Sequence, residues 1–139
     1  HRRSSAASDV YKRQGLRISS PNQGLFRIVT KDTEVQGVSI PKGSRIWVMF
    51  GAANRDESTF GNSEAFDPTR DNLKEHIAFG KGHHFCIGAP LSRLEGKVAF
   101  EELVRRLKLP TFTEGNTFEY ESSYVLRGLA GLEIDIEKK

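Results

Sequence analysis

A glycine-rich segment that contains the chain's one cysteine, residues 79–88, limits most strongly what this sequence can fold into. Gly80, Gly82 and Gly88 permit positive φ angles and a close approach of the backbone to a flat ligand. Cys86 directly precedes a stretch with helical periodicity. Its sulfur is therefore expected to meet unpaired N–H groups and the positive end of a helix dipole, and both favour a thiolate.

Several interpretations of the cysteine are open at this point. Phe79 and Phe85 are expected to keep water away from the loop, and a thiolate in a dry, glycine-lined loop suits an axial ligand of haem iron. A buried structural cysteine and a nucleophile paired with His84 are alternatives. A mononuclear metal site is a further one, although adjacent histidines seldom converge on one ion. Its ligands would be His76, His83, His84 and Cys86.

The apolar pattern predicts short strands and one clear helix. The helix follows Cys86, has Pro90 in its first turn and ends before Pro110, with Glu101–Arg105 and Glu102–Arg106 as i,i+4 pairs. Apolar residues on both sides of the strand 44–50 predict burial of both faces. Residues 51–80 show no period. The predicted strands are 24–30, 34–40, 44–50, 118–121 and 132–136.

Composition excludes several classes of protein. A chain of 139 residues with 37% hydrophobic side chains suits one folded domain, and one cysteine allows neither an intrachain disulfide nor a multi-thiolate zinc site. No apolar run reaches the 18 or so residues that a membrane span needs. The net charge of +3 lies entirely within residues 1–14, so it gives no indication of a nucleic-acid partner. We expect residues 1–14 to be a disordered or foreign tail, because they show neither helical nor strand periodicity.

Collinear motifs carry a resemblance to a known family. The pattern Phe79-x-x-Gly82-x-x-x-Cys86-x-Gly88, continued by AlaProLeuSerArgLeuGlu, resembles the haem-binding loop and proximal helix of soluble bacterial cytochrome P450. Further segments resemble the Glu-x-x-Arg helix and its following loop, the meander and the terminal hairpin. They are 14–17, 20–23, 54–56, 66–70 and 127–129.

The resemblance implies a fold and its extent. Residues 15–139 would be the C-terminal portion of a cytochrome P450 domain, of class α+β, within a family that is mainly α at full length. Its parts would be short β-sheets, the meander, the cysteine loop, the proximal helix and a terminal β-hairpin. The distal oxygen-binding helix and most of the substrate pocket would lie outside this chain.

The resemblance also implies the site residues. Cys86 would be the iron ligand, and the cofactor would be haem b, iron protoporphyrin IX. Arg27 and His84 would contact the haem propionates, although each could instead be an ordinary surface side chain. The whole set for haem would be Arg27, Phe79, Gly80, His84, Cys86, Ile87 and Gly88. The substrate pocket would include Gly24, Leu25 and Val125.

Two positions depart from the family pattern. Gln14 stands where the family has the glutamate of Glu-x-x-Arg, which leaves Arg17 without its carboxylate. Ala65 stands where many members have an arginine, so a second ion-pair partner is missing. We therefore expect Arg17 to have a structural role with an incomplete set of partners.

The implied activity is that of a haem-thiolate monooxygenase. It would insert one oxygen atom from O₂ into a small organic substrate with electrons from a ferredoxin or flavodoxin-type donor, as a cytoplasmic monomer without a membrane segment. Lys81, Arg93 and Lys97 would form a basic docking patch or simply a solvated helix face. A peroxide-using peroxygenase and a non-catalytic fragment with weak or no haem binding are the alternatives.

Overall fold

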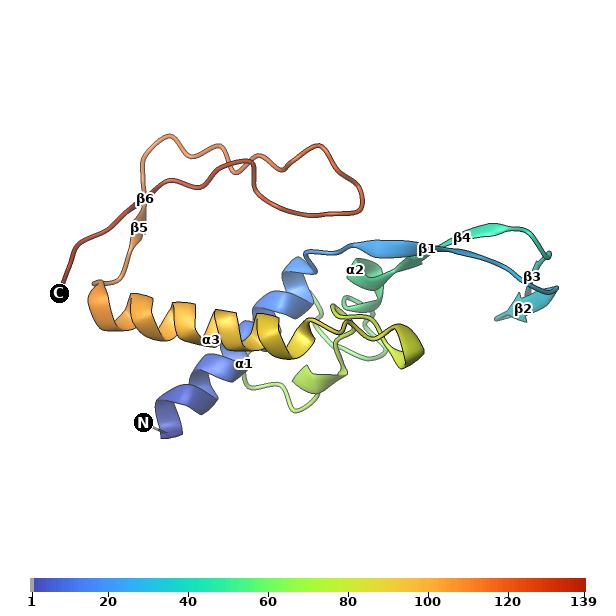
Figure 1. The fold of residues 1–139 in the computed structure, drawn as a ribbon, viewed down its shortest axis with the longest axis horizontal. Coiled ribbons are helices and arrows are strands. Elements are labelled where there is room, and N and C mark those ends of the chain that lie inside the picture. Colours follow the sequence, from blue (N-terminus) through green and yellow to red (C-terminus); the bar gives the residue numbers. More distant parts are fainter. Residues whose placement is uncertain (1) are drawn as a thin grey trace.

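Two long helices cross at the centre of the molecule. The computed structural model describes residues 2–139, with side chains from Asp9 onward. Helix α1 (Arg2–Ser19) contacts helix α3 (Ala89–Arg106), and a Cβ placed on Gly96 of α3 would lie 3.6 Å from Cδ of Lys12 (Figure 1). Close contact at a residue without a side chain brings the two helix backbones together.

The expectation that residues 2–14 lack regular structure is wrong, because they form most of α1. Residues 2–14 contain neither proline nor glycine, so no residue in this segment breaks a helix. An i,i+4 ion pair joins Arg13 Nε to Asp9 Oδ2 at 2.6 Å, and the Tyr11 ring lies 6.0 Å from that of Phe66. The tertiary contact and the local ion pair thus stabilise the helix, although its apolar residues show only a weak helical period. That residues 1–14 are foreign to the domain stays a prediction.

A two-stranded antiparallel sheet follows α1. Strand β1 (Gly24–Ile28) pairs with β4 (Arg45–Met49), and the register sets Leu25 opposite Val48. The predicted burial of both faces of β4 is wrong, since Val48 is 39% exposed and Met49 is 46% exposed. A sheet of only two strands has too little surface to cover both of its own faces.

The strand predicted over residues 34–40 is a hairpin of two shorter strands. β2 (Thr33–Val35) pairs with β3 (Val38–Ile40). Gln36 and Gly37 between them have φ angles of 50° and 80°. Two successive positive φ angles make the tight turn that joins antiparallel strands, so the alternating pattern conceals a reversal of the chain.

Residues 51–80 are mostly irregular, as predicted, with two short helices. They are α2 (Phe50–Ala53) and the 3₁₀ turn η1 (Leu73–Glu75); a second 3₁₀ turn, η2 (Gly82–His84), lies in the cysteine loop. Polar contacts hold the segment together: the Glu57 carboxylate accepts from the backbone N–H groups of Asn62 and Ser63 at 2.8 and 2.9 Å. Phe60 and Leu73 supply the buried apolar side chains nearby.

The predicted helix after Cys86 is α3, with Pro90 in its first turn. Of the two expected ion pairs, Glu102–Arg106 forms at 2.7 Å, but Arg105 also pairs with Glu102, at 2.6 Å, rather than with Glu101. The apolar side chains that recur at helical spacing along α3 are half exposed. They include Leu91, Leu94, Val98 and Leu103.

The C-terminal segment forms an open loop that returns along α3 (Figure 1). Its paired strands are β5 (Thr111–Phe112) and β6 (Ile134–Asp135). Residues 118–121, predicted as a strand, contribute only an isolated bridge between Tyr120 and Leu129, because Phe118 has a φ of 54° and interrupts extended backbone. The mixture of short sheets and helices confirms the predicted fold class. Within residues 2–139 none of the helices combines the length and apolarity that crossing a bilayer requires.

Candidate haem site

A buried polar network fixes α1 against the irregular segment. Arg17 is fully buried and donates from Nη1 to the carbonyls of Asn54 and Ser63 at 2.9 and 2.7 Å, and from Nη2 to that of Ala65 at 3.1 Å. Gln14 accepts from Arg17 Nε at 2.8 Å and donates to the Ala65 carbonyl at 3.0 Å. The glutamine thus fills the place of the missing carboxylate by hydrogen bonding, but it brings no negative charge.

The buried cation carries an electrostatic cost. Loss of water around the guanidinium, and then the positive charges of Arg70 and Arg55, lower the pKa of Arg17. The ring of Phe60 lies 5.1 Å from its Cζ and offers a cation–π contact in place of a counter-ion. Arg17 is therefore a structural residue, as predicted.

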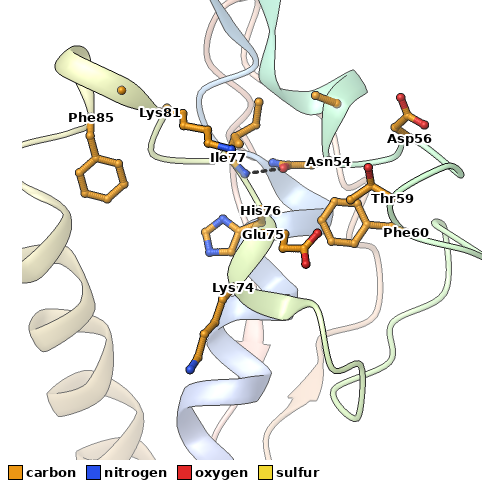
Figure 2. Close-up of a pocket in the computed structure, with 13 residues that line it drawn as sticks. Asn54, Asp56, Thr59, Phe60, Lys74, Glu75, His76, Ile77, Lys81 and Phe85 are labelled. Carbon is orange, nitrogen blue, oxygen red and sulfur yellow. Dashed lines mark hydrogen bonds between the residues drawn. The ribbon is translucent and has the colours of Figure 1, made fainter.

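Asn54 carries the network toward the cysteine loop. It is fully buried, its Nδ2 donates to Ser20 Oγ at 2.8 Å, and its Oδ1 accepts from the backbone N–H of Ile77 at 2.7 Å, the dashed line in Figure 2. Ile77 precedes Phe79 by two residues. One amide side chain thus connects α1 with the start of the loop.

The loop itself closes through the backbone of Cys86. Its N–H donates to the carbonyl of Phe79 at 2.9 Å, and its own carbonyl accepts from the N–H of Ala89 at 3.1 Å. Gly80 and Gly82 have φ angles of 72° and 74°, so glycine is required at both positions. These contacts seat the cysteine at the N-terminal end of α3.

A third glycine lies beside the sulfur. Gly88 is the N-cap residue of α3, and a Cβ there would lie 3.8 Å from Cys86 Sγ. The sulfur therefore lies at the end of the helix where N–H groups lack intrahelical partners, which agrees with the expected position.

A hollow of about 660 Å³ opens beside the loop, within the range of small-molecule and cofactor sites. Its walls come from β1, β4, the end of α1 and the cysteine loop. The predicted site residues that it brings together are Leu25, Arg27, Phe79, Gly80, His84 and Cys86.

Further residues of the hollow were not predicted. Val48 lies opposite Leu25 across the β1–β4 pair, on the same face of the sheet, and Phe50 follows β4. A hairpin alignment of the two strands would have indicated Val48, since cross-strand partners share a face. Phe50 Cζ lies 3.8 Å from a Cβ placed on Gly80, so a larger residue at position 80 would meet this aromatic wall. Ile77, Ala78, Lys81 and Ser92 also line the hollow.

Other predicted residues do not line it. Ile87 is 100% exposed, and Gly88 serves the helix N-terminus instead. Gly24 is buried against the opposite face of the sheet, where a Cβ would lie 2.4 Å from Trp47 Nε1. Val125 is placed beside β1 because its carbonyl accepts from the N–H of Gln23 at 2.7 Å.

Three positively charged or ionisable groups line the hollow. Arg27 is partly exposed and its Nη1 donates to the carbonyl of Phe26 at 2.9 Å; its guanidinium forms no ion pair with the carboxylates whose side chains the structure describes. His84 and Lys81 belong to the loop and are exposed. The arrangement suits a ligand that is flat and apolar with acidic groups at its edge.

The expectation of a dry loop is wrong for this chain. Phe85 is 46% exposed and the Cys86 thiol is exposed as well. The Phe79 and Phe85 rings form an edge-to-face pair 6.4 Å apart, and this pair does not enclose the thiol. Water can therefore reach the sulfur.

A second hollow of about 680 Å³ lies behind the loop, and its lining mixes acidic, basic and aromatic side chains (Figure 2). His76 is only 8% exposed there, and its Nδ1 accepts from the N–H of Ala78 at 3.3 Å. Burial, aided by nearby arginines, lowers the pKa of His76 to about 4. His76 is thus a neutral structural residue at pH 7.

The alternative of a metal site built from His76, His83, His84 and Cys86 is not supported. Among residues 2–139 the structure gathers no three His, Cys, Asp or Glu side chains in a position to hold one ion. A single cysteine beside a glycine-lined hollow is what remains.

Comparison with known proteins identifies the family. The family described as "Cytochrome P450" matches residues 15–128. A biotin biosynthesis cytochrome P450 of Bacillus subtilis is 36% identical over 122 residues, covering 88% of this chain and 30% of that protein. The 6-deoxyerythronolide B hydroxylase of Saccharopolyspora erythraea is 37% identical over 123 residues, again 88% of this chain and 30% of that protein.

Solved structures agree. A substrate-free cytochrome P450 of Mycobacterium marinum superposes with a TM-score of 0.92 at 34% identity, covering 95% of this chain and 34% of that one. P450BioI, in complex with an acyl carrier protein ligated to hexadec-9Z-enoic acid, superposes with a TM-score of 0.90 at 33% identity, covering 98% of this chain and 35% of that one. This chain belongs to the cytochrome P450 family, whose members are haem-dependent oxidoreductases and monooxygenases. It spans about a third of the length of the relatives that it matches.

Proposed function

We propose that this chain provides the haem-ligand portion of a soluble, cytoplasmic bacterial monooxygenase. Cys86 is the residue that binds haem iron through its thiolate. Arg27 and His84 would hold the two propionates, and Phe79 and Gly80 would contact the bound group. When bound, haem b supplies the redox-active iron for the insertion of one oxygen atom from O₂ into an organic substrate.

The hollow beside Cys86 is the observation that carries this proposal. Leu25, Val48 and Phe50 form an apolar wall opposite the thiol, and Gly80 leaves room that a Cβ would reduce. Arg27 lines the hollow and forms no ion pair with the carboxylates of residues 9–139, so its guanidinium is available for an acidic group. These features fit a flat apolar group that carries carboxylates at one edge.

The helix end determines what Cys86 can do. Cys86 lies just before the N-terminal end of α3, and the bond from its N–H to the Phe79 carbonyl fixes the backbone from which the side chain projects. Arg27 orients the group in the hollow through its edge. The residues of this chain thus bind and orient haem, and the bound haem supplies the redox chemistry.

The substrate would be a small organic molecule and the electron donor a ferredoxin or flavodoxin-type protein. By their names, the two relatives described above are a biotin biosynthesis cytochrome P450 and a 6-deoxyerythronolide B hydroxylase. We propose that Leu25 and Val125 form part of the substrate pocket's wall, since Leu25 lines the hollow and the backbone of residues 123–126 lies against the start of β1; Gly24, which faces the other side of the sheet, is not included.

A second proposal is that the chain by itself binds haem weakly and does not turn over. The open side of the loop favours it, because the Cys86 thiol and the Ile87 side chain are exposed. A hydrophobic cofactor exposed to water on one face gains less from burial than one covered on both.

Ferrous–CO spectroscopy tests both proposals. The chain mixed with haem, reduced and treated with CO is expected to give the red-shifted Soret band of a thiolate-ligated complex. Cys86→Ser, which keeps the size and removes the thiolate, is expected to lose that band while keeping the secondary structure seen by circular dichroism. An identical band in Cys86→Ser contradicts the assignment of the ligand, and loss of haem on a desalting column supports the second proposal.

A further inference from the structure

We propose that Arg93 is a positioning residue for the Cys86 loop. Its guanidinium Cζ lies 5.1 Å from the centre of the Phe79 ring and 6.0 Å from that of the Phe85 ring. These two rings flank the loop, one at its start and one directly before the cysteine. A cation over both ring faces attracts each of them.

The contact acts on Cys86 through the backbone. Phe79 supplies the carbonyl that accepts from the Cys86 N–H, and the Phe85 N–H donates to the Gly82 carbonyl at 3.0 Å. A movement of either ring therefore stretches a hydrogen bond that sets the direction of the thiol. Figure 2 shows the Phe85 ring projecting from the loop, away from the side of the pocket that holds Asp56 and Thr59.

The environment of Arg93 differs from that of an ordinary surface cation. Its Nε is shielded from water and has no hydrogen-bond partner among the described residues, and the residue is partly buried. Lys97, one turn further along α3, lies 3.9 Å from Glu101 and is 46% exposed in its side chain. Of the basic residues considered for a docking patch, Arg93 is thus directed inward onto the loop, and Lys97 remains at the surface.

The guanidinium is better suited to this role than an ammonium. It is planar and weakly hydrated, so it can stack between two rings and tolerate a shielded N–H more readily than a lysine would. A conservative replacement is therefore expected to restore only part of the effect.

Amide hydrogen exchange in the haem-free full chain tests the proposal. In Arg93→Met the N–H groups of Phe85 and Cys86 are expected to exchange about fivefold faster than in the parent chain, the size that loss of two cation–π contacts implies. Arg93→Lys is expected to fall between the two. Lys97→Met removes a charge from the same face of α3 and is expected to leave both amides unchanged.

The Ile77 amide separates positioning from general loosening. Ile77 donates to the Asn54 side chain, and the loop hydrogen bonds of Phe79 and Phe85 do not include it, so its exchange rate is expected to stay within twofold in Arg93→Met. Equal acceleration at Ile77 and Cys86, no acceleration at Cys86, or the same acceleration in Lys97→Met would each overturn the proposal.

A haem readout extends the test and rests on the proposed function. In Arg93→Met the ferrous–CO complex is expected to show a smaller share of the thiolate-type Soret band than Lys97→Met at equal haem. If the parent chain gives no such band, the second proposal, weak haem binding by the chain alone, is supported over the first, and the exchange result still decides whether Arg93 positions the loop.

Discussion

Replacing Gln14 with glutamate tests the account of the buried network. In Gln14→Glu the carboxylate would face Arg17 Nε, which now lies 2.8 Å from the amide oxygen. Arg17 is a fully buried cation, and it forms no ion pair with the carboxylates of residues 9–139. Burial already lowers its pKa. We expect the substitution to stabilise the fold at pH 7, because it supplies the missing counter-charge.

The size follows from two opposing effects. Two unit charges about 4 Å apart attract by about 4 kcal/mol at an effective dielectric constant of about 20. Removing the carboxylate from water and losing the Nε2 donor to the Ala65 carbonyl costs about 2 to 3 kcal/mol; Arg17 Nη2 still satisfies that carbonyl at 3.1 Å. The net gain is about 1 to 2 kcal/mol, or about 4 to 8 °C in Tm for a chain of this length.

The sign of the pH dependence gives a second check. The Arg17 charge would hold the pKa of the new carboxyl below its unfolded value of about 4.3. The gain is therefore complete above that pH and is lost as the pH falls through the lower folded pKa, where a protonated glutamate resembles glutamine. Urea unfolding at pH 7 and at about pH 3.5 should show a smaller difference between variant and parent at the lower pH.

A matched control removes the effect of composition. Gln36→Glu makes the same chemical change at an exposed turn position and is expected to alter stability by less than about 0.5 kcal/mol. A Gln14→Glu variant that is no more stable than the parent at pH 7 would refute the argument that Arg17 lacks a counter-charge.

Two further predictions concern stability. Because burial holds the pKa of His76 at about 4 against an unfolded value of 6.5, the unfolded chain binds more protons between these limits; the free energy of unfolding should fall by about 2 to 3 kcal/mol as the pH drops from 6.5 to 4. His76→Asn, measured by urea titration across that range, should have a flatter profile, and an unchanged slope would contradict the assignment. Gly24→Ala should lower the urea midpoint by an amount that corresponds to about 1 to 3 kcal/mol, since its Cβ would lie 2.4 Å from Trp47 Nε1 and 2.5 Å from the Val48 carbonyl. Gly61→Ala, which meets no atom within 4 Å, is the control and should leave the midpoint nearly unchanged.

The cysteine loop could be predicted because its constraints are local. Glycines at positions 80 and 82 are required by positive φ angles, and a helix that starts after Cys86 fixes where the sulfur lies. The start of α3 could be predicted for the same reason, because Pro90 marks its first turn. Each of these features depends on residues that are neighbours along the chain.

Features that depend on distant partners were harder to predict. The helix over residues 2–14 follows from contacts with α3 and with Phe66, far along the sequence, and the weak period gives no sign of them. The reversal at Gln36 and Gly37 was hidden because apolar residues alternate on both sides of it. The expected dryness of Cys86 assumed that two aromatic rings enclose the loop, whereas they leave the thiol exposed.

Polar contacts, more than apolar burial, determine where the cysteine loop lies. Few apolar side chains of the described residues are buried, whereas Gln14, Arg17, Ser20 and Asn54 are all fully buried. Each buried polar group that loses its partner costs about 1 to 3 kcal/mol, so this network tolerates few alternative arrangements. Since Asn54 bonds both to Ser20 at the end of α1 and to Ile77 at the entrance of the loop, any shift of α1 is transmitted to the backbone that holds Cys86. The glutamine at position 14 preserves this geometry without the charge, and the position of the thiol therefore depends on an amide that can hydrogen-bond to Arg17 but cannot neutralise it.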